Sequence, residues 1–285
     1  MQKRVMAIHD ISCVGRCSLT VALPILSAAG LDTGVLPTAV LSTHTGGFEG
    51  FTYRDLTQDI LPIAEHWESL DLKFDALYSG FLGSYEQIDM IATVFEKCKK
   101  DGGFVLVDPV MADNGKMYSI YTPEMANGMK KLCAKADIIV PNLTEAAFLL
   151  EEEYIGNAYT PVYIEETVKK LAALGAKMVV LTGVSFEEGK SGAACYDSQT
   201  GTLDYVTSDR IEGHFHGTGD IFGSALLGGL MLDYSLKDSA QIAADFTTES
   251  IKCCVELKQE KRYGVAFERA LPYLIDSLNI GVNKK

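Results

Sequence analysis

The sequence predicts an α/β fold in which one mostly parallel sheet is covered by helices on both faces. Short runs rich in β-branched residues recur along the chain without the apolar–polar alternation of a half-exposed sheet. Segments with helical periodicity separate these runs, as crossover connections between parallel strands require. The 285 residues, 47% of them apolar, suffice for one large core. We therefore expect a single domain over residues 1–285.

Each expected strand is an apolar run that stops at polar or turn-forming residues. These runs lie at residues 5–8, 35–41, 75–79, 104–108, 137–140 and 177–181. The helical patterns between them cover residues 19–29, 85–100, 122–135, 143–152 and 161–174. Two more runs, 192–196 and 203–207, flank a turn-forming segment and are expected to form a hairpin. The helical period returns over residues 237–257 and 266–278.

Polar residues gather where the expected strands stop. In parallel sheets, ligands bind beyond the carboxyl ends of the strands. Those ends carry Asp10, Thr45, Gly80, Asp108, Asn142, Glu145 and Thr182. The polar segment 42–50 contains three glycines and is expected to be a mobile loop.

The segment Gly217-Thr218-Gly219-Asp220 leads directly into an apolar helical pattern. Two glycines let several backbone N–H groups point the same way, and a helix start adds unpaired donors and partial positive charge. The segment is therefore expected to bind an anion such as a phosphate. Asp220 can take the proton from an attacking alcohol there, but an ordinary capping aspartate also stands at such a place, and the pattern alone leaves both roles open.

Composition restricts the classes of partner. A formal net charge of −13 argues against binding to nucleic acid or an anionic membrane, because both need clustered Lys and Arg. The seven cysteines show no paired C-x-x-C spacing and suggest reduced thiols of a cytoplasmic protein. The N-terminal residues show no signal-peptide pattern, and no apolar run reaches membrane-spanning length.

Five motifs occur in a characteristic order along the chain. They are Asp10, Ser42-Thr43-His44-Thr45, Asp108-Pro109-Val110-Met111, Pro141-Asn142-Leu143-Thr144-Glu145 and Gly217-Thr218-Gly219-Asp220. With these motifs the chain resembles the pyridoxal kinase family of the ribokinase-like superfamily over most of its length. The resemblance implies a three-layer α/β/α sandwich. It also implies ATP-dependent phosphorylation of the 5′-hydroxymethyl group of a B6 vitamer (pyridoxal, pyridoxamine or pyridoxine) in vitamin B6 salvage.

The resemblance also implies roles for individual residues. Asp220 would be the catalytic base, and Gly217, Thr218 and Gly219 would form the anion hole. Nucleotide contacts would come from Asn142, Thr182, Ile211, Phe215 and Thr218. Mg²⁺ would lie near Asp108, Asp113 and Glu145, and K⁺ is a further candidate cation.

Ordinary structural roles remain open for several of these residues. Asn142 and Glu145 also fit a helix cap with its capping-box partner, and the two roles are compatible. Asp108 also fits a turn-capping carboxylate before Pro109. Buried aromatic packing is the alternative for Phe215.

On the substrate side, the resemblance places Asp10, His44, Thr45 and Phe81 around the pyridine ring. Many members of the family have serine where Asp10 stands, and tyrosine is frequent at position 81. A carboxylate repels an ionised 3-oxygen. Our hypothesis is therefore that Asp10 favours a substrate ring that bears an amine or is protonated. The loop 43–50 would fold over the substrate and exclude water.

The sequence leaves three alternatives to B6 phosphorylation. Hydroxymethylpyrimidine (phosphate) kinase of thiamine biosynthesis also acts on a flat ring that bears a hydroxymethyl group. Sugar and nucleoside kinases are disfavoured because Ala28-Ala29-Gly30 stands where their early Gly-Gly motif is expected. A non-catalytic nucleotide-binding or B6-binding protein is disfavoured by the intact motif at Asp220. The family resemblance also implies a homodimer, although no surface for it is evident from the sequence.

Overall fold

A large sheet forms the centre of the molecule in the computed structural model, which describes residues 2–118 and 120–281. Within this described part nine strands join in the order β11-β10-β9-β8-β5-β4-β1-β2-β3. Their bounds are β1 Arg4–Ser12, β2 Asp32–Leu41, β3 Tyr53–Asp55, β4 Phe74–Ser79, β5 Lys99–Val107, β8 Ile138–Ile139, β9 Met178–Thr182, β10 Lys190–Asp197 and β11 Thr202–Asp209. All six expected strands and the expected hairpin are present.

The strands from β2 to β9 in this order pair in parallel, whereas β3, β10 and β11 are antiparallel to their neighbours. The prediction of a mostly parallel sheet is therefore confirmed. The edge strand β3 was not predicted. Its three residues are all exposed, so no apolar run marks it. A small separate hairpin, β6 (Ala112–Asp113) with β7 (Lys116–Met117), was also not predicted.

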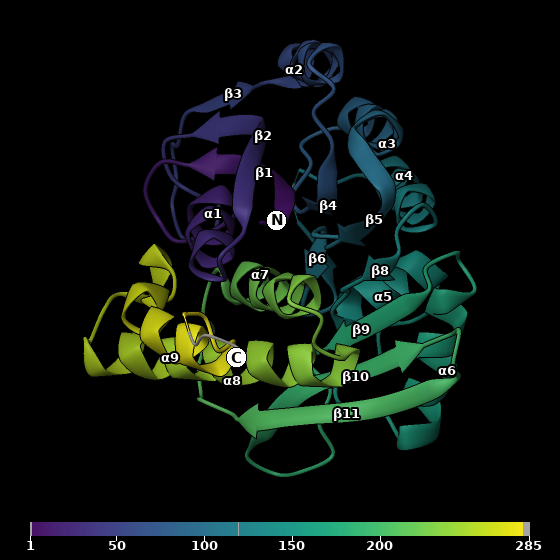
Figure 1. Ribbon diagram of the computed structural model, residues 1–285. Coiled ribbons are helices and arrows are strands. Elements are labelled where there is room, and N and C mark those ends of the chain that lie inside the picture. Colours follow the sequence, from purple (N-terminus) through teal and green to yellow (C-terminus); the bar gives the residue numbers. More distant parts are fainter. Residues whose placement is uncertain (1, 119, 282–285) are drawn as a thin grey trace.

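Helices cover both faces of the sheet (Figure 1). One face carries α1 (Leu19–Ala28), α7 (Thr218–Met231), α8 (Leu236–Glu256) and α9 (Leu271–Ser277), whose apolar side chains share one core cluster. The other face carries α2 (Thr57–Ser69), α3 (Tyr85–Cys98), α4 (Pro123–Cys133), α5 (Leu143–Leu150) and α6 (Pro161–Ala172), which share the second cluster. The arrangement has the three layers that the sequence predicted.

The expected helix over residues 266–278 is wrong in its first turn. A short 3₁₀ turn, η2 (Phe267–Arg269), comes first, and α9 begins only at Leu271. Pro272 follows at the second position of α9, where its missing N–H costs nothing. The break falls at Ala270, which ends η2 and is the N-cap of α9.

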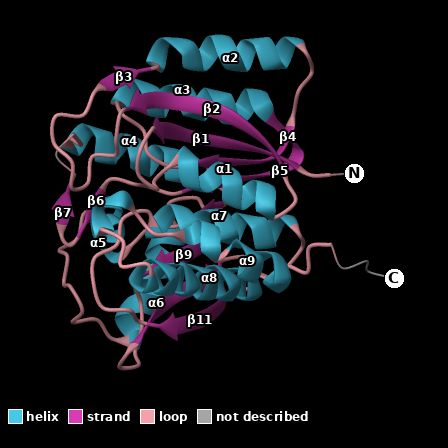
Figure 2. Ribbon diagram, turned by 90° about the vertical axis from the view of Figure 1, so that its left-hand side faces the viewer, coloured by secondary structure: helices cyan, strands magenta, loops and turns pink. Residues whose placement is uncertain are grey.

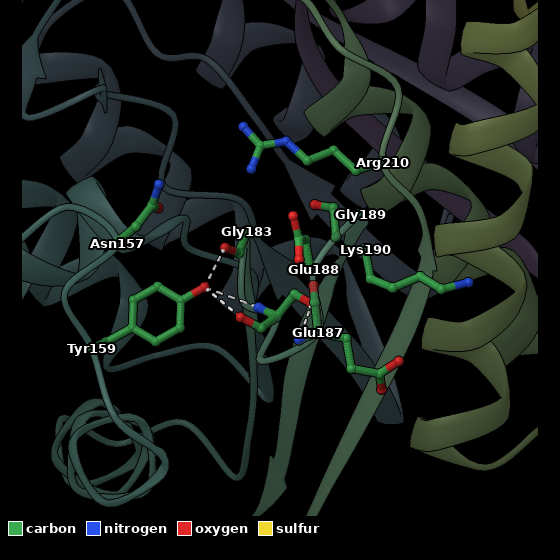
Figure 3. A pocket seen from close by; sticks show the side chains of 10 residues that line it. Asn157, Tyr159, Gly183, Glu187, Glu188, Gly189, Lys190 and Arg210 are labelled. Atoms are coloured by element: carbon green, nitrogen blue, oxygen red, sulfur yellow. Dashed lines mark hydrogen bonds between the residues drawn. The ribbon is translucent and has the colours of Figure 1, made fainter.

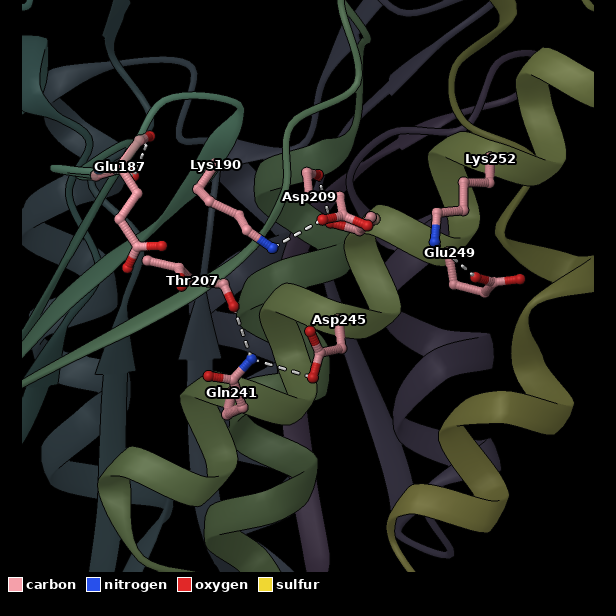
Figure 4. Close-up of polar contacts among 10 residues, drawn as sticks. Glu187, Lys190, Thr207, Asp209, Gln241, Asp245, Glu249 and Lys252 are labelled. Atoms are coloured by element: carbon pink, nitrogen blue, oxygen red, sulfur yellow. Dashed lines mark hydrogen bonds and ion pairs between the residues drawn. The ribbon is translucent and has the colours of Figure 1, made fainter.

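Helix α7 is buried along almost its whole length because glycines let its neighbours approach. A Cβ at Gly228 would lie 3.0 Å from the Cβ of Ala29, and one at Gly229 would lie 2.7 Å from Ser239 Oγ. Helix α8 is in turn held to the sheet, since Gln241 Nε2 donates to the carbonyl of Thr207 in β11 over 3.0 Å (Figure 4). The C-terminal turns of α7 are thereby packed against α1 and α8, and α8 is held to the sheet.

The loops that follow the parallel strands lie together at one end of the sheet. Figure 2 shows the N-terminus at the opposite end, where β1 starts, and β6 and β7 among the loops beyond the carboxyl ends. The beginning of α7 also faces these loops, as the contacts below show. Over residues 2–118 and 120–281, helices of the length and apolarity needed to cross a lipid bilayer are absent.

Candidate active site

The start of α7 has the geometry of an anion-binding helix terminus. Gly217 is the N-cap residue, with φ +82°, and α7 begins at Thr218, as the sequence predicted. A Cβ at position 217 would lie only 2.1 Å from the carbonyl oxygen of Arg16, so a side chain cannot be placed there. The backbone is therefore pressed against the loop after β1, and the amides of the first turn remain available to a ligand.

Asp220 does not cap the helix, so the capping role left open by the sequence is wrong. No side chain caps the start of α7. Instead Asp220 Oδ2 accepts a hydrogen bond of 2.8 Å from the backbone N–H of Ser18. Burial raises the pKa of Asp220 to about 7, and the charge of Asp10 adds to this rise, while the Ser18 N–H opposes it. A carboxylate with such a pKa is suited to general-base catalysis near neutral pH.

Asp10 lies in β1 and is buried, with 4% of its surface exposed. Ser12 Oγ donates to its Oδ2 over 3.1 Å. Burial raises the pKa of Asp10, against the hydrogen bonds from the Ser18 and Ser12 hydroxyls. The structure therefore brings Asp10 and Asp220 to one place, because Ser18 contacts both carboxylates.

A second pair of buried carboxylates, Asp108 and Glu145, lies beside the same helix terminus. Asp108 follows β5, and its Oδ2 is 3.9 Å from the place that a Cβ on Gly219 would occupy. Burial raises the pKa of Asp108, and the charges of Glu145 and Asp220 raise it further. Burial likewise raises the pKa of Glu145. A cation placed between such carboxylates relieves both their burial and their repulsion.

Asn142 and Glu145 form the capping box that the sequence allowed. Asn142 Oδ1 accepts from the N–H groups of Thr144 and Glu145, and Glu145 Oε2 accepts from the N–H of Asn142 over 2.9 Å. Glu145 Oε1 accepts from the N–H of Met111 over 3.2 Å. The capping box fixes the Glu145 carboxylate, and it leaves a role of these residues toward a metal open.

The donor set fits Mg²⁺ in chemistry. Magnesium is typically held by one or two carboxylates while it keeps several water ligands. Asp113 is more exposed than Asp108 and Glu145: its side chain is 40% exposed, and its Oδ2 lies 4.0 Å from His214 Nδ1. Within the described residues, no group of three or more His, Cys, Asp and Glu side chains is already arranged to hold a metal ion.

The residues expected to contact the nucleotide lie at the end of β9, at the N-cap of α5, at the start of α7 and in the segment before α7. Thr182, at the end of β9, forms an isolated parallel bridge with Asn142. Thr218 Oγ1 donates to the carbonyl of Phe215 over 3.4 Å. Phe215 is buried, and Lys261 Nζ lies 4.9 Å from its ring centroid. Ile211 packs against the core cluster of α7 and α8.

A polar pocket of about 240 Å³ lies at the loop that follows Thr182. Figure 3 shows Tyr159 and Asn157 on one side of it and Arg210 reaching over it from the other. Tyr159 Oη donates to the carbonyl of Ser185 and accepts from the Ser185 N–H, which orders the loop after β9. The lining residues are Asn157, Tyr159, Gly183, Ser185, Glu187, Glu188, Gly189, Lys190, Ser191 and Arg210.

The expected ring-binding residues have different surroundings. Both nitrogens of His44 already bond to the backbone: Nε2 pairs with the carbonyl of Arg262 over 2.5 Å, and Nδ1 accepts from the Gly46 N–H over 3.1 Å. Thr45 is exposed. Phe81 is half-buried and lies edge-on to Tyr121, with ring centroids 5.9 Å apart. Of these residues, Asp10 lies nearest to Asp220.

Sequence reasoning missed the residues of the loop after β1 that meet α7. Ser18 supplies the N–H to Asp220, and Arg16 supplies the carbonyl against Gly217. The N–H of Arg16 in turn donates to the carbonyl of Tyr263 over 3.0 Å. Backbone contacts of this kind leave no signal in residue type. His9, beside Asp10 in β1, was also missed, although an imidazole next to a strand-end carboxylate is a recognisable signal.

Comparison with known proteins identifies relatives over most of the chain. A model of the phosphomethylpyrimidine kinase family matches residues 28–265. The pyridoxine kinase of Bacillus subtilis is 32% identical over 189 residues, which are 65% of this chain and 66% of that protein. The match thus spans slightly less than two thirds of that relative.

Solved structures match over a larger share. Pyridoxal kinase from Lactobacillus plantarum superposes with a TM-score of 0.89 and 31% identity, over 97% of this chain and 98% of that chain. A candidate phosphomethylpyrimidine kinase from Bacteroides thetaiotaomicron, crystallised in an orthorhombic form with pyridoxal, has a TM-score of 0.91 and 36% identity, over 96% of each chain. The expected ribokinase-like fold is confirmed by these likenesses.

Proposed function

Because this chain belongs to the family of pyridoxal and phosphomethylpyrimidine kinases, we propose that it transfers the γ-phosphoryl group of ATP to the 5′-hydroxymethyl group of a B6 vitamer. One observation carries the proposal. The largely buried Asp220 carboxylate, whose side chain is 14% exposed and whose pKa lies near neutrality, stands at the glycine-bounded start of α7. The names of the relatives support a B6 alcohol as acceptor, and the pyridoxal of the Bacteroides thetaiotaomicron crystals supports a site for its ring.

The residues of this chain divide the chemistry as follows. Asp220 takes the proton of the 5′-hydroxyl while the oxygen forms a bond to the γ-phosphorus, and the bond from that phosphorus to the β,γ-bridging oxygen breaks to release ADP. The amides of Gly217, Thr218 and Gly219 donate to the phosphoryl oxygens as charge shifts among them. The helix start holds these donors in place before the substrate arrives, so little reorganisation is needed.

We further propose Mg²⁺ at the carboxylates of Asp108, Asp113 and Glu145, with K⁺ as a second candidate cation. Held there, a magnesium ion would supply positive charge to the phosphate oxygens and would help to orient the nucleotide. Asp108 supplies a carboxylate whose burial favours a cation nearby. The capping box keeps Glu145 from turning toward the phosphates, because both of its oxygens accept backbone N–H groups.

The nucleotide would run along the row of Thr182, Asn142 and Phe215, with Ile211 bordering the base. Thr182 and Asn142 stand side by side in neighbouring strand ends, which places their side chains on one edge of the sheet. The polar pocket under Arg210 extends this edge and offers a cation to a polyphosphate or polar groups to a ribose.

A turnover screen tests the proposal. Purified protein with ATP and Mg²⁺ is offered pyridoxal, pyridoxamine, pyridoxine and hydroxymethylpyrimidine separately, and ADP release is measured by a coupled assay. We expect kcat/KM for the best B6 vitamer to exceed that for hydroxymethylpyrimidine by about 100-fold, the discrimination that missing ring contacts typically cause. A preference for hydroxymethylpyrimidine would instead assign the protein to the second candidate function, which the family model favours.

Asp10 is expected to set the preference among the vitamers. Its buried carboxylate disfavours an ionised 3-oxygen and favours a positively charged amine nearby. In Asp10→Ser we expect the ratio of kcat/KM for pyridoxamine to that for pyridoxal to fall about tenfold, which corresponds to one modest charge interaction. The three vitamers are compared in wild type and variant, and equal ratios in both proteins would remove this role.

A further inference from the structure

His9 in β1 is a completely buried imidazole without a hydrogen bond. Its exposed surface is 0%, and neither of its ring nitrogens has a partner within the part of the chain that the structure describes. The ring meets the ring of Tyr78 in β4 edge-on, with centroids 4.5 Å apart and an interplanar angle of 80°. A buried polar group without a partner is costly, and few persist in folded proteins without a functional reason.

The imidazole is directed at the carboxylate of Asp220. His9 Nδ1 lies 3.9 Å from Asp220 Oδ1, just beyond the range of a hydrogen bond. The other carboxylate oxygen, Oδ2, accepts the N–H of Ser18. Oδ1 is therefore the oxygen that remains for the substrate hydroxyl, and it is the one that His9 faces.

The position of the His9 ring is fixed by glycines on two neighbouring elements. A Cβ at Gly80, directly after β4, would lie 2.4 Å from both Nδ1 and Cε1 of His9. A Cβ at Gly223 in α7 would lie 2.5 Å from Tyr78 Oη, so α7 presses on the tyrosine that supports the imidazole. The ring thus occupies a slot between β4 and α7 that admits no extra methyl group.

We propose that His9 is a positioning residue for Asp220, whose carboxylate it holds ionised and directed at the acceptor hydroxyl through a hydrogen bond from Nδ1–H to Oδ1 in the loaded enzyme. The proposal rests on the proposed function of Asp220. It requires Asp220 Oδ1 and His9 Nδ1 to approach by less than about 1 Å to reach ordinary hydrogen-bond distance.

The electrostatic surroundings make such a donor necessary. Burial lowers the pKa of His9 to about 3, so the ring stays neutral and donates one N–H without bringing a charge. The other titratable groups around Asp220 are acids, and their charges oppose ionisation of one another. They are Asp10 on β1, Cys17 in the following loop, Tyr78 on β4, Asp108 after β5 and Tyr118 after β7. A neutral donor offsets this repulsion.

Two substitutions at position 9 test the proposal. His9→Leu keeps the volume but removes the donor, and His9→Gln keeps an N–H donor. For His9→Leu we expect kcat to fall about 10- to 30-fold at pH 7 with KM for vitamer and ATP within about 2-fold, and the acidic limb of the kcat–pH profile to move up by about one unit. His9→Gln is expected to restore most of kcat and the wild-type limb. Gly80→Ala, which displaces the ring without removing it, is expected to resemble His9→Leu.

A direct titration separates this role from turnover. The pKa of the Asp220 carboxyl is measured by ¹³C NMR in wild type, His9→Leu and His9→Gln, with and without a B6 vitamer. A rise of about one unit in His9→Leu and none in His9→Gln supports the proposal even if no alcohol is phosphorylated, in which case only the proposed function fails. An unchanged Asp220 pKa in His9→Leu overturns the proposal whatever the activity.

A control isolates the effect of removing a buried unpaired polar atom. Ser239 Oγ in α8 is likewise buried without a partner among the described residues. Ser239→Ala is expected to leave the kcat–pH profile unchanged. The proposal is wrong if His9→Leu and His9→Gln lose activity equally while the acidic limb of the kcat–pH profile stays at its wild-type position. A lowered unfolding midpoint in both variants would then show that His9 is a structural residue.

Discussion

Asp220→Asn is expected to lower kcat by about 1,000-fold, which is within the range that a general base contributes. Asparagine has nearly the same shape, and its amide oxygen can still accept the N–H of Ser18 that now holds Asp220 Oδ2. The substitution therefore removes the base without removing the support of the site. Turnover is measured by ADP release, and the affinity for vitamer and ATP is measured by calorimetry.

The affinities are expected to stay within about 3-fold of wild type, because binding does not depend on proton transfer. Asp204→Asn is a matched control, since Asp204 forms a surface ion pair with Lys237 and its substitution changes one carboxyl to an amide away from α7. In the wild type, the base acts in its ionised form, so kcat/KM should rise as the pH passes through about 7. Wild-type turnover in Asp220→Asn would show that Asp220 is not the base.

Gly217→Ala is expected to lower kcat/KM by at least about 100-fold, comparable to the loss of an oxyanion-hole donor. The new methyl group would lie 2.1 Å from the carbonyl oxygen of Arg16, so the backbone of the anion loop must shift. The residue also has φ +82°, which alanine adopts at a cost. Together the two effects are expected to reduce the free energy of unfolding by about 2–3 kcal/mol, measured in urea.

Gly201→Ala separates the two effects. Gly201 lies in the turn between β10 and β11 with φ +72°, and a Cβ there would meet no atom within 4 Å. It is expected to cost only about 1 kcal/mol of stability and to leave the kinetics unchanged. Equal kinetic losses in both variants would mean that the contact between residue 217 and Arg16 has no special role.

Much of the fold could be predicted from residue patterns because the parallel strands are buried on both faces. Such strands form continuous apolar runs, and β1, β4 and β9 were found in this way. The edge strand β3 could not be predicted in this way. It pairs with β2 through its backbone, and its three residues are exposed, so no apolar run marks it. The last expected helix starts late, at Leu271 with Pro272 in its first turn, because a 3₁₀ turn comes first, and periodicity does not register that turn.

The candidate site was predictable in residue type and less so in geometry. The motif around Asp220 marked the start of α7, and the spacing of Asn142 and Glu145 marked a capping box, because both are local features. The partner of Asp220 is a backbone N–H 202 positions earlier in the chain, and no side-chain pattern encodes such a contact. His44 was expected at the substrate, and the structure shows its nitrogens engaged by backbone groups from two segments.

The contact of Arg16 with Gly217 and Tyr263 has a consequence for the nascent chain. Three segments separated by most of the sequence must be present before the loop after β1 can take its final path. Contacts between residues so far apart in sequence form slowly, because the chain loses the entropy of a long open loop before the contacts stabilise it. A polypeptide still on the ribosome with α7 to α9 unsynthesised would therefore carry a largely paired sheet and no assembled catalytic centre. Substrate or nucleotide added at that stage would find no assembled site to bind, so we expect either ligand to stabilise the protein only after the chain is released.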